Sequence, residues 1–142
     1  MVALDDPAPL RYRTSVALRS GNAALALHHA RLWQAVQPRY AAPHVAVARA
    51  LRAHDPPRLQ RGLQVLDAAL KEADIISYAE RGLIEEELVR TLIDLADDAS
   101  IQRAHELSSV MLSRPASRDV QRRRERMVAP LRERSAGGKQ PL

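Results

Sequence analysis

One helical pattern recurs three times along this chain of 142 residues. Its first copy, GNAALALHHARLWQAVQP from Gly21 to Pro38, combines a glycine turn, an amphipathic helix and a proline that ends the helix. If Ala26 is the small residue that faces a neighbouring helix, Gly62 and Ala104 hold the equivalent places, 36 and then a further 42 residues along. A helical unit repeated at this period predicts stacked helical hairpins, each of which buries its apolar face on the next.

Apolar spacing and helix-end signals predict six or seven helices. The first is expected at residues 9–20, the second within the Gly21–Pro38 copy, and the others at about 43–53, 59–70, 78–96, 100–113 and 117–130. No segment shows the sustained alternation of apolar and polar residues that is typical of a strand. The sequence therefore predicts an all-α protein.

Three serines stand where helix caps are expected. Ser77 and Glu80 have the spacing of a capping box, and Ser100 and Ser117 can cap the two helices that follow. These positions set the predicted starts of the last three helices.

The first copy also carries a family resemblance. Its turn glycine, small inward-facing residues and closing proline are Gly21, Ala26, Leu27, Ala30 and Pro38. At these spacings they resemble the second helix of a tetratricopeptide repeat, and the resemblance extends over about residues 9–113. It implies a short right-handed superhelix of antiparallel hairpins, in which the first helices line a concave groove for an extended peptide or a helix of another protein.

The expected organisation has four parts. Residues 1–8 form a flexible lead-in, 9–113 the tetratricopeptide-like domain, 114–134 a basic helix that caps the array, and 135–142 a disordered tail. An irregular helical bundle with coincidental spacing is the alternative to the repeat.

Arginines on the first helices of the hairpins are the candidate partner-binding residues. Arg11 and Arg19 belong to the first helix, and Arg49 and Arg52 to the third. On the tetratricopeptide resemblance these four side chains lie near the groove, where guanidinium groups attract carboxylates. The alternative reading is that they are solvated surface arginines.

The charges fall into three blocks. Residues 1–66 carry nine arginines and three acids, residues 67–113 four bases and eleven acids, and residues 114–142 nine bases and three acids, or about +6, −7 and +6. Because screened charges act over about 8 to 10 Å, the chain is dipolar rather than uniformly basic. Such a pattern can be satisfied within one chain or between subunits, so a homo-oligomer is one interpretation.

The C-terminal block suggests a second class of partner. Clustered arginines supply affinity for polyanions, and a segment without aromatic residues lacks the stacking platforms that bind single strands. A solvating end helix is the structural alternative. The candidate polyanion-binding residues are Arg118, Arg122, Arg123, Arg124 and Arg126.

Several kinds of site are excluded or disfavoured by the sequence. The chain has no Cys, and no two of its five histidines have helical ligand spacing, so we expect no metal and no cofactor. Three consecutive carboxylates, Glu85, Glu86 and Glu87, fan around a helix and are expected to form a solvated face rather than an acid/base pair. With no phosphate-binding glycine loop and no nucleophile elbow, we expect no enzyme.

These observations favour a binding protein. The absence of a signal-peptide pattern and of a long apolar run predicts a cytoplasmic protein that does not span a membrane. We expect a non-catalytic protein-protein interaction module, an adaptor, small chaperone or assembly subunit, which binds an acidic peptide or helix through the arginine-lined groove. Nucleic-acid binding through the C-terminal arginines is the alternative.

Overall fold

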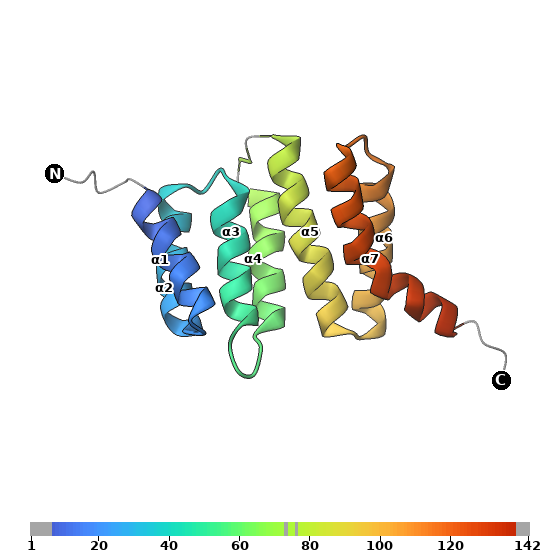
Figure 1. The fold of residues 1–142 in the computed structure, drawn as a ribbon, viewed down its shortest axis with the longest axis horizontal. Helices are drawn as coiled ribbons and strands as arrows, with labels where there is room; N and C mark the ends of the chain where they lie inside the picture. Colours follow the sequence, from blue (N-terminus) through green and yellow to red (C-terminus); the bar gives the residue numbers. More distant parts are fainter. Residues whose placement is uncertain (1–6, 73, 76, 139–142) are drawn as a thin grey trace. The chain divides into compact units, whose positions relative to one another are not determined.

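The computed structural model describes residues 7–72, 74–75 and 77–138, and over these residues it contains seven helices and no strand (Figure 1). The predicted all-α class and number of helices are therefore confirmed. The helices are α1 (Ala8–Arg19), α2 (Ala23–Val36), α3 (Ala41–Arg52), α4 (Leu59–Glu72), α5 (Tyr78–Leu95), α6 (Asp98–Ser113) and α7 (Arg118–Gly138).

The chain divides into two compact units, Met1–Glu87 and Leu88–Leu142, and the division falls within α5. In the first unit each of the helices α1 to α4 packs on the next, and α1 also contacts α3 (Figure 1). The cluster of buried side chains that holds α1, α2 and α3 together is Ala17, Ala26, Leu27, Ala30, Trp33, Ala46, Val47, Ala50 and Leu51. Helices α1 to α4 therefore pack in the order in which they occur along the chain.

Small residues let the helices of the first unit approach closely. Ala26 and Ala30 are fully buried on α2, as expected from their place in the first copy. Gly62 of α4 lies against Ala48 of α3, and a methyl group at position 62 would be 3.6 Å from the Ala48 carbonyl oxygen. That distance is an ordinary van der Waals contact, so the site has room for alanine.

The turn before α2 needs glycine for a different reason. Gly21 has a φ of 77°, in the left-handed region, and beyond its two chain neighbours no atom lies within 4 Å of where its Cβ would be. The next residue, Asn22, caps α2, because its side-chain oxygen accepts a hydrogen bond from the Leu25 N–H at 3.1 Å. Gly21 therefore serves backbone conformation and not packing.

Of the caps predicted for the last two helices, one differs from the structure and one is as predicted. The helix expected to start at Ser100 is capped instead by Asp97, whose carboxylate accepts hydrogen bonds from the Ser100 N–H and hydroxyl, each at 2.8 Å. An ionised side chain is the stronger acceptor for a helix N-terminus, and the helix begins two residues earlier. Ser117 does act as a cap, accepting from the Val120 N–H at 3.3 Å.

The capping box predicted for α5 forms only in part. The Ser77 hydroxyl accepts a hydrogen bond from the Glu80 N–H at 3.3 Å, as predicted. The Glu80 carboxylate instead accepts from the Ala41 N–H at 2.6 Å, at the start of α3. The first amides of a helix lack partners within the helix, and here a side chain of α5 satisfies one of α3.

In the second unit α6 packs against α7, and Met111, Val128 and Leu131 are buried. The prediction that the seventh helix ends near Pro130 is wrong, because α7 continues through this proline to Gly138. A proline inside a helix removes one hydrogen bond and bends the helix without necessarily ending it, and α7 bends part-way along (Figure 1). Of the expected tail, 135–138 belong to this helix and 139–142 lie outside the described residues.

Two glycine substitutions should change stability in opposite directions. Gly62→Ala should raise the free energy of unfolding by about 0.5–1 kcal/mol, because alanine loses less backbone entropy in a helix and fits the site. Gly21→Ala should lower it by about 1 kcal/mol, because alanine is strained at positive φ. Urea unfolding followed by the fluorescence of Trp33, the single tryptophan, measures both. Stability changes of the same sign in both variants would contradict the different roles assigned to Gly21 and Gly62.

Candidate partner-binding surface

Arg11 and Arg19 lie together on the exposed side of α1. They are separated by eight positions, which brings them to one face of the helix. Between them is a surface hollow of about 680 Å³, the α1 hollow, lined by Ala8, Arg11, Tyr12, Ser15, Leu18 and Arg19. Tyr12 is 68% exposed, so the hollow combines two cations with an accessible aromatic ring. Arginine and tyrosine are the residue types that most often anchor protein interfaces.

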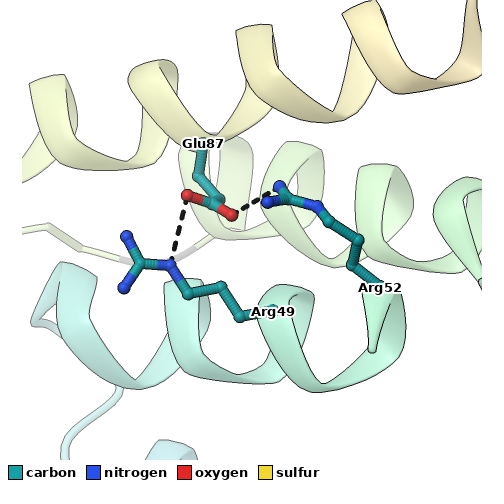
Figure 2. Close-up of polar contacts among 3 residues, drawn as sticks. All are labelled: Arg49, Arg52 and Glu87. Carbon is teal, nitrogen blue, oxygen red and sulfur yellow. Dashed lines mark hydrogen bonds and ion pairs between the residues drawn. The ribbon is translucent and has the colours of Figure 1, made fainter. Parts of the chain in front are cut away.

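Arg49 and Arg52 meet at a carboxylate of α5. Arg52 Nη2 donates to Glu87 Oε1 at 2.5 Å, and Arg49 Nε donates to Glu87 Oε2 at 3.4 Å (Figure 2). The Glu87 side chain is 1% exposed, that of Arg52 27% and that of Arg49 52%. Two cations of α3 are thus bound to one buried anion of α5, and Arg49 is the more accessible of the two.

Replacing Glu87 should destabilise the protein. In Glu87→Gln the shape is kept but both guanidinium groups lose a charged acceptor, so the free energy of unfolding should fall by about 2 kcal/mol in urea titrations followed by Trp33 fluorescence. Asp55→Asn makes the same chemical change at an exposed position and should stay within about 0.5 kcal/mol of the parent. Equal effects of the two variants would mean that the buried contacts contribute nothing.

The burial of Glu87 and its neighbours was missed by the sequence analysis. Glu85, Glu86 and Glu87 are all buried, so the solvated face predicted for them is wrong. The run is flanked by the buried residues Ile84 and Leu88, and from 84 to 92 nearly every position of α5 is shielded from solvent. Apolar residues on every side of a helix indicate burial, and this local signal was present in the sequence.

The acids that pair with the arginines of the N-terminal helices come from later in the same chain. Between residues 7 and 54 the chain has seven arginines and no acid. Arg39 pairs with Asp74 at 3.4 Å, and Arg49 and Arg52 bind Glu87. The other four are exposed and form no ion pair with any residue that the structure describes; they are Arg11, Arg13, Arg19 and Arg31. Positive charge therefore remains on α1 and α2.

His29, on α2, is in the same basic environment, close enough to Arg13 of α1 to feel its charge. Burial, followed by the neighbouring His28 and Arg13, lowers the pKa of His29. The His29 Nδ1 is buried and has no hydrogen-bond partner among the described residues, so a second ring proton would be poorly accommodated. The neutral imidazole is the form that fits this site.

The lowered pKa of His29 predicts a stability that depends on pH. Below about pH 6.5 the unfolded chain takes up a proton at this residue that the folded chain resists, so stability is complete above that pH and declines as pH falls. Urea unfolding between about pH 7.5 and pH 5.5 should show a steeper decline for the parent than for His29→Gln. Parallel pH profiles for the two proteins would contradict the prediction.

The C-terminal arginines are not a continuous basic surface. Arg118, Arg122 and Arg126 are exposed at intervals of four residues along one side of α7. Asp119 and Glu125 lie beside them and, with Arg122 and Arg126, line a second surface hollow of about 610 Å³. The interleaved carboxylates reduce the attraction of this face for phosphate groups.

The remaining two predicted arginines of α7 point differently. Arg124 is buried and its Nη1 donates to the Met111 carbonyl at 3.4 Å, while Arg123 is half-buried. Position 124 lies four and seven residues before the buried Val128 and Leu131, so it falls on the inward side of the helix. Arg124 therefore belongs to the packing of α6 on α7 and not to an exposed polyanion site.

The structure also bears on metal sites, on membrane-spanning helices and on the role of His44. Among the described residues no group of three or more histidines and acids is arranged to hold a metal ion, and no helix is long and apolar enough to cross a membrane. The buried His44 bonds to Gln34 at 2.8 Å and to the Pro38 carbonyl at 2.6 Å, a structural role.

Comparison with protein-family models, curated proteins and solved structures finds no match to this chain.

Proposed function

We propose that this protein is a non-catalytic protein-protein interaction module, an adaptor, small chaperone or assembly subunit of tetratricopeptide-like design. Its partner presents an acidic peptide or helix to the α1 hollow. The observation that carries the proposal is the pair Arg11 and Arg19, which line the α1 hollow with Tyr12, are exposed and have no carboxylate partner among the described residues. Guanidinium groups that share a hollow with an accessible aromatic ring suit an acidic segment that carries an apolar residue.

Charge gives such a contact its selectivity. Because no acid occurs between residues 7 and 54, a partner carboxylate that approaches α1 meets no like charge from α1, α2 or α3. A basic partner would be repelled by the same arginines. A second copy of this chain is one partner that could supply the acids, and binding to itself would then weaken as salt rises.

Nucleic-acid binding is the less favoured function. The exposed arginines of α7 alternate with Asp119 and Glu125, and Arg124 is withdrawn from the surface. Phosphate affinity depends on the number of cations that reach the backbone, and three on one side of a helix give a weak site.

Reversing the charge of the α1 hollow should abolish partner binding. Affinity purification from the native cell with quantitative mass spectrometry should recover the same proteins with the parent and with Arg58→Glu/Arg61→Glu, and lose them with Arg11→Glu/Arg19→Glu. The control variant makes the same change in net charge at two exposed arginines at the start of α4.

Two outcomes would contradict the proposal. One is an unchanged set of partners after charge reversal in the α1 hollow. The other is nucleic acid that copurifies with the parent and is lost only in Arg118→Glu/Arg122→Glu/Arg126→Glu, which would favour the alternative function.

A further inference from the structure

Arg49 is held at one end of its guanidinium group and open at the other. Its Nε donates to Glu87, whereas Figure 2 shows its two terminal nitrogens pointing away from that carboxylate. The side chain is 52% exposed, and it forms no other hydrogen bond or ion pair with the residues that the structure describes. The terminal nitrogens, with four N–H groups, therefore face outward.

Glu87 fixes the direction in which these groups point. Its carboxylate is buried and is bound from the other side by Arg52, so it cannot turn to follow a moving Arg49 side chain. A guanidinium group oriented in advance loses less side-chain entropy when it binds a ligand. The ion pair between α3 and α5 thus prepares a binding group as well as joining two helices.

We infer that Arg49 is a second anchor for the acidic partner, with its terminal nitrogens forming a bidentate pair with one aspartate or glutamate side chain of that partner, and that Glu87 is the positioning residue. This inference rests on the proposed function. Charge supports the choice of ligand, because α1, α2 and α3 contain no acid that would repel an approaching carboxylate. The planar fork of arginine matches a carboxylate, and lysine cannot reproduce it.

A protein carboxylate fits this site better than a nucleic acid. Besides Arg49, α3 carries a single further base, Arg52, and that side chain is bound to Glu87. Binding to a phosphate backbone depends on several cations acting together, whereas one oriented guanidinium group recognises one carboxylate.

The test uses the full chain and fluorescein-labelled poly-glutamate, with fluorescence anisotropy as the measure of affinity. Arg49→Lys keeps the charge but loses the fork, so it should bind about tenfold more weakly, with a smaller change in urea unfolding than Glu87→Gln. Glu87→Gln should also weaken binding, because Arg49 is no longer oriented. The matched control, Arg61→Lys on α4, should stay within about twofold of the parent.

Each result decides between named alternatives. If Arg49→Lys binds like the parent while Arg11→Glu/Arg19→Glu binds more weakly, this inference is wrong and the proposed function stands. If the parent itself does not bind poly-glutamate, both are wrong. If single-stranded DNA binds more tightly than poly-glutamate and depends on Arg49, the ligand is phosphate. Should Glu87→Gln fail to fold, Arg49→Lys and Arg49→Gln decide the matter alone.

Discussion

A buried carboxylate that two arginines of α3 share is the contact on which the first unit most depends. Glu87 is almost fully shielded from solvent and binds Arg49 and Arg52 across 38 and 35 positions of the chain. Removing a charge from such a pair leaves the other charges buried and poorly compensated, which is why the geometry of α3 and α5 is coupled to it. Glu80 acts in the same direction by binding the first amide of α3.

These contacts explain where the charge of the chain resides. The acidic block of residues 67–113 does not form one exposed negative surface, because several of its carboxylates are used within the protein. Glu80, Glu87 and Asp74 all serve the basic helices or the loops beside them. The arginines that α5 does not reach, on α1 and α2, keep their charge available to a partner.

Local sequence patterns predicted the helices well but did not predict which charged side chains are buried. Apolar spacing located each helix of the described residues, although not the end of α7, because the pattern of a half-buried helix depends on neighbours three and four positions away. The pairing of the buried Glu87 involves instead partners in a distant segment, Arg49 and Arg52, which no local window contains. The same limit applies to Arg124, which was grouped with its exposed neighbours although its position in the helical turn faces inward.

For the candidate site, too, the sequence supplied part of the answer and the structure the rest. The tetratricopeptide resemblance suggested Arg11, Arg19, Arg49 and Arg52, but only the structure separates the first pair, exposed along the α1 hollow, from the second pair, bound to Glu87. The most direct test is an NMR titration of the isotopically labelled protein with poly-glutamate. We expect chemical-shift changes at the amides of α1 and α3 and at the Arg49 side-chain Nε. Changes confined to α7, or larger changes with single-stranded DNA, would contradict a binding surface made by the N-terminal arginines.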